Sequence, residues 1–252
     1  MIRKLISLLQ IVYTIYALSV FVLIMLLVFP FVLLSLIFGV VKGGNLIYLL
    51  CKIWARTWYF LVGIQHKNIY EAPYDTSRQY IFVANHVSYL DIPPAVLAVQ
   101  QPCRVLGKYE MIKYPVFGLI YKAAVILVDR RNAEARAKSV RALKSALKKG
   151  ISIFIFPEGT FNESPQPLKS FFDGAFKLAI ESQTPIKPLL FIDTLDRLHY
   201  RSIFAASPGP NRVVFLETIE VAGLEMKDME VLKEKVYWAM DAGLRRYRDY
   251  GN

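Results

Sequence analysis

An uncharged run of 37 residues, from Leu5 to Val41, limits most strongly what this chain can fold into. A helix that crosses a bilayer needs roughly 20 apolar residues. At about 1.5 Å per residue, a straight helix over the whole run would reach roughly 55 Å, against about 30 Å for one hydrocarbon core. We therefore expect a first helix over residues 5–29, a break near Pro30 and a second helix that continues to about Gly63.

Two arrangements of this leader remain open. It forms a hairpin that spans or re-enters the bilayer, or a pair of helices that lie partly in one leaflet. A hairpin leaves Arg3, Lys4 and the C-terminal domain on the same, cytoplasmic side. A cleaved signal peptide is disfavoured because its apolar region has roughly 7–15 residues. The second helix carries residue types that belong at headgroup level, namely Lys42, Lys52, Trp54, Arg56 and Trp58.

Composition and charge exclude several classes of protein. Hydrophobic residues make up 55% of the chain, which excludes a disordered protein. The two cysteines, Cys51 and Cys103, form neither a disulfide framework nor a zinc motif. The net charge is +11, and residues 104–150 alone carry twelve basic and three acidic residues. Beside an apolar leader, this basic block predicts contact with anionic lipid headgroups rather than with nucleic acid.

The remainder alternates short apolar runs with helical patterns. This predicts an α/β fold with a mixed or largely parallel sheet flanked by helices. We divide the chain into membrane-anchoring helices over residues 1–63 and an α/β domain over 64–252, with residues 64–79 as the only plausible hinge. Helices are expected over residues 133–149, 170–182 and 226–247. The expected strands cover residues 80–83, 105–106, 125–128, 151–156, 186–191 and 212–216.

The first motif that carries chemistry runs from Asn85 to Asp91, directly after an expected strand. Ligands of α/β proteins usually bind at the carboxyl ends of strands. His86 has the intrinsic pKa of a general base near neutrality. If the chain turns here, Asp91 reaches the imidazole and fixes its tautomer. Capping stays open as a second role, because Asp91 precedes Ile92-Pro93 and Ser88-x-x-Asp91 matches a capping box.

Further candidates also follow expected strands. In Phe156-Pro157-Glu158-Gly159-Thr160, Glu158 can accept a hydrogen bond from a substrate hydroxyl, and Gly159 permits close backbone approach. Arg130 has the planar guanidinium that suits a phosphate, and Lys108 is a weaker candidate of the same kind. Thr184-Pro185-Ile186-Lys187-Pro188 is interpreted as a structural strand entry. Neither a glycine-rich phosphate loop nor a metal motif is present in the sequence, so no metal is expected.

Taken in order, these motifs resemble those of a known family. Asn-His-x4-Asp at 85–91, Asp-Arg at 129–130, Phe-Pro-Glu-Gly-Thr at 156–160 and Pro-Ile-x-Pro at 185–188 are similar to the phospholipid/glycerol acyltransferase superfamily. Within it, the bacterial 1-acyl-glycerol-3-phosphate acyltransferases are most similar. The resemblance covers about residues 70–220 and implies a glycerol-3-phosphate acyltransferase-like fold after a two-helix membrane motif.

The resemblance also implies a reaction at a membrane. His86, oriented by Asp91, would deprotonate the 2-hydroxyl of lysophosphatidic acid, which would attack an acyl thioester directly and give phosphatidic acid. The expected donor is acyl-CoA or acyl carrier protein, without a further cofactor and without a covalent acyl-enzyme. The resemblance assigns substrate binding to Asn85, Lys108, Arg130, Glu158, Gly159 and Thr160.

Two positions depart from the family pattern and leave the acceptor open. Phe161 stands where the family commonly has arginine, and Asp173 precedes Gly174 where a basic residue is frequent. Both changes remove positive charge near the expected phosphate site. A lysolipid without a terminal phosphomonoester, such as a lyso-aminolipid, is therefore an alternative acceptor. A membrane-tethered lipid-binding protein with a decayed site is the alternative from another functional class.

Overall fold

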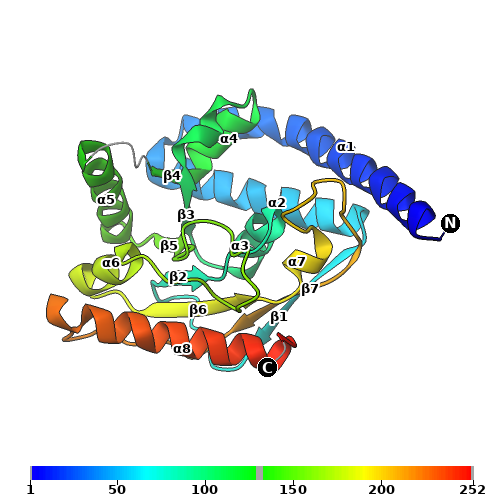
Figure 1. Cartoon of the computed structure of the whole chain (residues 1–252). Helices are drawn as coiled ribbons and strands as arrows, with labels where there is room; N and C mark the ends of the chain where they lie inside the picture. The colour runs from blue at the N-terminus through cyan, green and yellow to red at the C-terminus, as the bar shows by residue number, and fades with distance from the viewer. Residues whose placement is uncertain (1, 129–132, 251–252) are drawn as a thin grey trace.

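The computed structural model, which describes residues 2–128 and 133–250, contains a seven-stranded sheet in its described part (Figure 1). The strand order is β1-β7-β6-β2-β5-β3-β4, and all neighbouring pairs are parallel except β6 with β7. The predicted mixed, largely parallel α/β sheet is thus confirmed. The strands are β1 (Ile64–Tyr70), β2 (Ile81–Ala84), β3 (Cys103–Lys108), β4 (Val125–Val128), β5 (Ser152–Ile155), β6 (Ile186–Phe191) and β7 (Gly209–Phe215).

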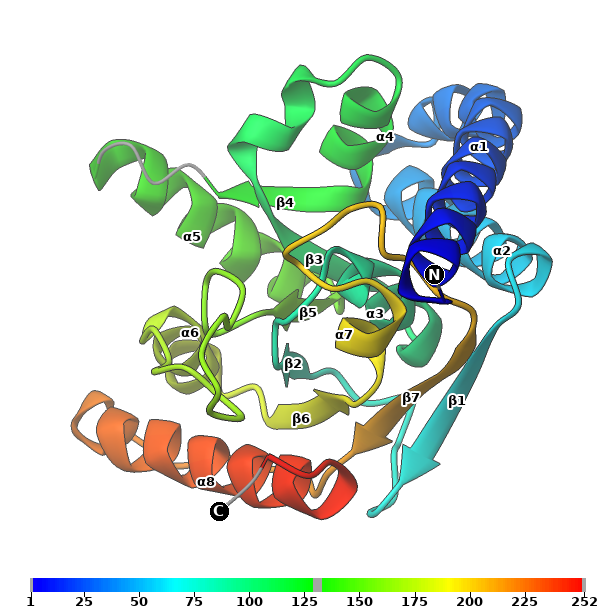
Figure 2. The same cartoon turned by 45° about the vertical axis from the view of Figure 1, so that its right-hand side comes forward.

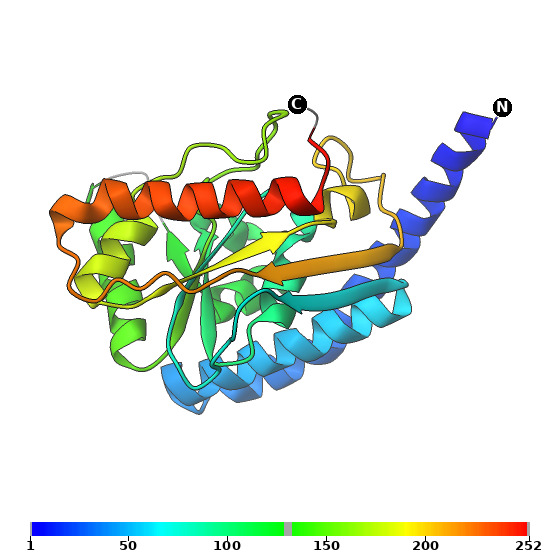
Figure 3. The ribbon, with the colours of Figure 1, turned by 90° about the horizontal axis from the view of Figure 1, so that it is seen from below.

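Helices cover both faces of the sheet, and alternate strand residues enter two different cores. In β2, Ile81 and Val83 pack with α5, α6 and α8, whereas Phe82 packs with α2 and α3. Figure 3 shows α8 and α2 on opposite sides of the strands. The helices are α1 (Ile2–Leu36), α2 (Gly44–Leu61), α3 (Ile92–Ala98), α4 (Phe117–Ala124), α5 (Ala133–Lys148), α6 (Gly174–Ser182), α7 (Thr194–Arg197) and α8 (Met229–Tyr247).

The first helix runs six residues beyond the expected break. The prediction that it ends near Pro30 is wrong, because α1 continues to Leu36 and the chain reverses over residues 37–43. Proline removes only one backbone hydrogen bond, and apolar helices tolerate it where packing is continuous. Glycine determines the reversal instead. Gly39 has φ +76°, and Gly43 lies so close to the Ser35 carbonyl that a Cβ would clash with it.

The second helix of the leader is an integral part of the α/β fold. Tyr48 of α2 is buried in the core beneath the sheet together with Phe82. Trp54 and Trp58, expected at headgroup level, are instead buried between the first two helices. Their indole N–H groups donate to the carbonyls of Phe21 and Ala17 in α1, at 3.2 and 2.8 Å. Therefore α2 joins α1 to the sheet.

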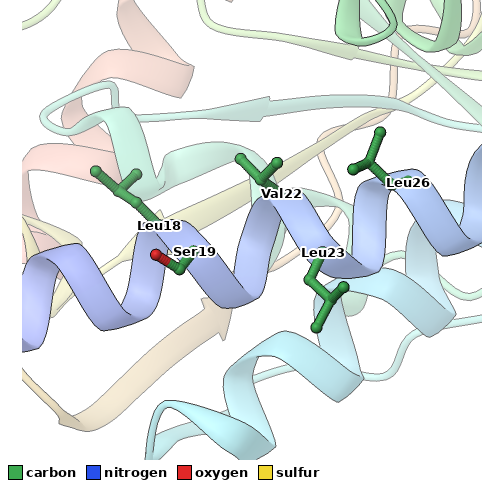
Figure 4. A pocket seen from close by; sticks show the side chains of 5 residues that line it. All are labelled: Leu18, Ser19, Val22, Leu23 and Leu26. Atoms are coloured by element: carbon green, nitrogen blue, oxygen red, sulfur yellow. The ribbon is translucent and has the colours of Figure 1, made fainter.

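Among the described helices, α1 alone is long and apolar enough to cross a membrane. It contacts α2 and α4 along one side, as Figure 2 shows, and leaves large apolar side chains exposed on the other. A shallow hollow on this exposed side has Ser19 as its one polar member. The lining residues, labelled in Figure 4, are Leu18, Ser19, Val22, Leu23 and Leu26. This continuous apolar surface fits the acyl chains of lipids.

Residues 64–70 form an edge strand rather than part of a hinge. The segment Ile64–Tyr70 pairs in parallel with β7, from Ile64 opposite Gly209 to Tyr70 opposite Phe215. The hinge prediction for residues 64–79 is therefore wrong for its first part. The apolar-polar alternation that marks a half-buried strand is absent from this segment, because an edge strand needs little apolar surface.

The close approach of Gly43 to Ser35 predicts a stability effect. In Gly43→Ala, the new Cβ lies 2.2 Å from the Ser35 carbonyl oxygen, so the turn between α1 and α2 must shift. We expect a loss of about 1–3 kcal/mol, or a thermal-unfolding midpoint in detergent lower by roughly 2–10 °C. Gly174→Ala is the matched control, because nothing lies within 4 Å of its Cβ position. Equal midpoints for the two variants would contradict the packing described here.

Candidate active site

The site lies at the carboxyl ends of two adjacent parallel strands in the middle of the sheet. β2 leads into His86, β5 leads into Glu158, and these strands pair from Ile81 opposite Ile153. Parallel strands end at one edge of a sheet, where the loops that follow them meet. The two motifs therefore come together although 72 residues separate His86 from Glu158.

The imidazole of His86 is held by one buried carboxylate. Asp91 Oδ2 lies 2.7 Å from His86 Nδ1, and it also accepts hydrogen bonds from the backbone N–H groups of Val87 and Ser88 at 2.7 and 2.9 Å. Because a carboxylate only accepts, Nδ1 carries the ring proton. Nε2 is then left with a lone pair that can take a proton. The contact expected from the five-residue spacing is present.

The same carboxylate also caps the turn that follows. Ser88 Oγ accepts from the backbone N–H of Leu90 at 3.0 Å, and the Ser88 N–H donates to Asp91. This capping box starts a short 3₁₀ turn (Tyr89–Asp91) that leads directly into α3. Asp91 therefore both contacts the imidazole and takes part in the capping box. Its side chain makes no capping hydrogen bond to α3, so the expected cap on the helix at Ile92 is wrong. The rigid turn fixes the carboxylate, and the carboxylate fixes the imidazole.

Glu158 connects the two loops of the site through backbone groups. It is 1% exposed, and its Oε1 accepts from the His86 backbone N–H at 2.8 Å. Its Oε2 accepts from the Lys169 backbone N–H at 2.9 Å. Burial, the largest effect, raises the pKa of this carboxyl from its ordinary 4.5 to about 7. The expected hydrogen bond from an acceptor hydroxyl to Glu158 remains a prediction.

Aromatic rings surround the imidazole. Phe156 stacks on His86 with the ring centroids 4.2 Å apart, and Phe161 meets it edge-on at 4.5 Å. Phe161 also contacts Tyr89 at 4.8 Å. The side chain of His86 keeps 16% of its surface exposed. The imidazole is thus flanked by apolar rings on two sides.

The other expected substrate ligands lie in different surroundings. Both ends of the buried Asn85 amide bind the backbone of Phe191, at 3.0 and 2.7 Å, which ties β2 to β6. Lys108 is exposed at the end of β3, and Arg130 lies outside the described residues. Gly159 has φ +70° in the turn after Glu158. Thr160 Oγ1 accepts from Lys169 Nζ at 2.6 Å. Their roles in binding remain predictions.

Sequence reasoning did not identify Lys169 as a part of the site. It lies in a loop without regular periodicity, eleven residues after Glu158, so no pattern pointed to it.

Asp173 was expected to weaken the positive potential, but Lys177 and Lys233 pair with it at 3.4 and 3.0 Å. The hydrogen bond from Lys233 is the largest effect that holds the pKa of Asp173 below its ordinary value.

Residues 2–128 and 133–250 were expected to hold no metal ion. These described residues contain no group of three or more His, Cys, Asp or Glu side chains placed to bind one. Among the described groups, His86 can perform proton transfer beside the rings of Phe156 and Phe161.

Comparisons with known proteins agree with the geometry. A family model described as acyltransferase matches residues 64–192. The 1-acyl-sn-glycerol-3-phosphate acyltransferase alpha of Mus musculus is 29% identical over 166 residues, which are 65% of this chain and 58% of the mouse protein. The beta protein of Homo sapiens is 28% identical, over 65% of this chain and 59% of its own length. The matched segment thus spans less than two thirds of these relatives.

A solved structure shares the fold over nearly the whole chain. The crystal structure of the 1-acyl-sn-glycerophosphate (LPA) acyltransferase PlsC from Thermotoga maritima superposes with a TM-score of 0.74. The two sequences are 20% identical, and the match covers 97% of each chain. At this identity the likeness concerns the fold alone.

The raised pKa of Glu158 predicts how stability depends on pH. A carboxyl that holds its proton more tightly when folded stabilises the protein below its unfolded pKa, and this stabilisation is lost as the pH rises through its folded pKa. With values near 4.5 and about 7, the stability of the protein relative to Glu158→Gln should fall by on the order of 2–3 kcal/mol between pH 4.5 and 7.5. Thermal unfolding of both proteins across this range measures it, and parallel curves would contradict it.

Proposed function

The chain belongs to the acyltransferase family through its match over residues 64–192, and we propose that it transfers a fatty acyl group from an acyl thioester to the 2-hydroxyl of 1-acyl-sn-glycerol 3-phosphate. The product would be phosphatidic acid, a precursor of phospholipids. The relatives named for this reaction support the acceptor. The observation that carries the proposal is the 2.7 Å contact between His86 Nδ1 and Asp91 Oδ2, which leaves Nε2 as a base.

The proposed step is a direct transfer. His86 Nε2 takes the proton of the acceptor hydroxyl while the hydroxyl oxygen attacks the thioester carbonyl. The tetrahedral intermediate collapses, the C–S bond breaks, and the thiolate receives the proton from the imidazolium. Asp91 stabilises the imidazolium that exists between these two proton transfers. The ester bond forms as the thioester bond breaks, and no covalent acyl-enzyme is needed.

The candidate acyl donors are inferred from the charge of the protein. Residues 104–150 carry a balance of +9, which suits the phosphates of acyl-CoA and the acidic surface of an acyl carrier protein equally well. Acyl-CoA and acyl carrier protein therefore both remain candidate donors. The same block would attract anionic headgroups at about 1 kcal/mol for each basic residue near the surface.

We also propose that the protein works at the inner membrane, with the α/β domain on the cytoplasmic side. The exposed apolar side of α1 supports membrane attachment. Because α2 is packed against both α1 and the sheet, α1 holds the domain close to the lipid surface. A lysolipid would then reach His86 without leaving the membrane interface completely.

Two alternatives differ from this proposal in the acceptor or in the absence of catalysis. Phe161, in contact with His86, stands where the family commonly has arginine, which favours an acceptor without a phosphomonoester. A non-catalytic lipid-binding protein would need the apolar surface of α1 but not the His86–Asp91 contact. Both alternatives are distinguished from the proposed reaction by one assay.

The proposal predicts that acyl transfer depends on His86 and Asp91. Purified full-length protein in mixed micelles is supplied with labelled acyl-CoA or acyl carrier protein and with a panel of lysolipids. We expect transfer to 1-acylglycerol 3-phosphate, a loss of about 10³-fold or more in His86→Ala, and a loss of roughly 10²–10⁴-fold in Asp91→Asn. His199→Ala is the control for loss of a histidine, and it should keep its activity.

The outcomes separate the candidates. Full turnover by His86→Ala would exclude the proposed base. Binding of lysolipid without turnover in the unsubstituted protein would favour the lipid-binding alternative. Transfer to a lyso-aminolipid in preference would correct the acceptor, and release of free fatty acid without acceptor would indicate a hydrolase.

A further inference from the structure

A hollow on the protein surface adjoins the His86–Asp91 pair. Phe161 forms part of its wall and also contacts the imidazole ring of His86 at 4.5 Å. The hollow is lined by Thr160, Phe161, Glu163, Ser164 and Lys169. Of these five residues, one is a cation. An acceptor whose hydroxyl lies at His86 can therefore extend along Phe161 toward Lys169.

The hydrogen-bond partners of the Lys169 ammonium group carry no charge. Its Nζ donates to the hydroxyl of Thr160 at 2.6 Å and lies 3.4 Å from the Phe161 carbonyl oxygen. Both partners are neutral, and in the described part of the chain no carboxylate oxygen lies within ion-pair distance of this Nζ. Glu163 lines the same hollow, but its side chain is exposed to solvent. Lys169 can therefore bind an external anion.

Glu158 fixes the position of Lys169 relative to His86. Its two carboxyl oxygens accept from the backbone N–H groups of His86 and Lys169, at 2.8 and 2.9 Å. One buried carboxyl group therefore links the loop that carries the base to the segment that carries the cation. The backbone of the segment that carries the cation is therefore held beside the loop that carries the base.

The neighbouring acid does not cancel this positive charge. Asp173 pairs with Lys177 and with Lys233, and Lys233 also pairs with Glu230 at 2.8 Å. Phe161, in place of the arginine common in the family, thus forms an aromatic wall. Lys169, eight residues later in the same loop, supplies the positive charge.

We propose that Lys169 binds the anionic headgroup of the lysolipid acceptor and thereby selects acceptors that carry a phosphate. This inference rests on the proposed acyltransferase function and assigns the headgroup to a residue outside the Phe-Pro-Glu-Gly-Thr motif. Lys169 donates to a phosphate oxygen, while Thr160 keeps the ammonium group pointed into the hollow. A phosphomonoester is therefore preferred over an uncharged headgroup.

The test compares a charged with an uncharged acceptor. Initial rates are measured for full-length protein in mixed micelles with 1-acylglycerol 3-phosphate and with 1-acylglycerol, which lacks the phosphate. For Lys169→Met we expect kcat/KM toward the phosphate acceptor to fall roughly 10–100-fold, mostly through a higher KM. The value for the uncharged acceptor should change less than about twofold. Lys169→Arg should retain most of the selectivity.

Lys235→Met, an exposed lysine of α8, is the matched control for the loss of one positive charge. An equal loss with both acceptors would overturn the proposal, since Lys169 would then only support the loop. Unchanged selectivity in Lys169→Met would overturn it as well, with the acyltransferase function intact. If the unsubstituted protein transfers to neither acceptor, the proposed function fails. Equilibrium binding of 1-acylglycerol 3-phosphate to the unsubstituted protein and to Lys169→Met is then measured. Equal affinities would overturn the proposal that Lys169 binds the phosphate.

Discussion

The arrangement of the whole site depends on one oxygen atom, Oδ2 of Asp91. Three N–H groups converge on it: the ring Nδ1 of His86 and the backbone amides of Val87 and Ser88. Asp91 is fully buried, so these interactions are not exchanged for water. A short turn, a helix start and the tautomer of an imidazole are thereby determined together. A loop at the end of a parallel strand is thereby held rigid, as the proposed proton transfer requires.

The second constraint is the buried carboxyl of Glu158, which acts on backbone rather than on side chains. It joins the His86 loop to the segment around Lys169 through their backbone N–H groups, so the imidazole ring and the ammonium group take no part in these hydrogen bonds. The leader supports the site from one face of the sheet, because α2 contributes Tyr48 to the core that contains Phe82 of β2. The apolar helix α1 and the site at the end of β2 are thus parts of one packed structure.

Much of this architecture could be predicted from the sequence, since it follows from local patterns. Strands apolar on both faces, such as Ile81–Ala84, show where the covered sheet lies, and the residues after them belong to one edge. The spacing of His86 and Asp91 indicated their contact. Edge strand β1 has no such pattern, and the end of α1 depends on a tertiary approach between Gly43 and Ser35. Lys169 was not predicted because its place depends on a hydrogen bond of its backbone, which sequence does not encode locally.

In the proposed mechanism Asp91 keeps the ring proton of His86 on Nδ1, so that Nε2 can act as the base. ¹⁵N NMR of protein labelled at its three histidines measures this tautomer directly, with His86→Ala to assign the signal. Above the pH at which the ring is charged, His86 should show a protonated Nδ1 and an unprotonated Nε2, and Asp91→Asn should lower this preference. A neutral His86 with its proton on Nε2 in the unsubstituted protein would exclude Nε2 as the base.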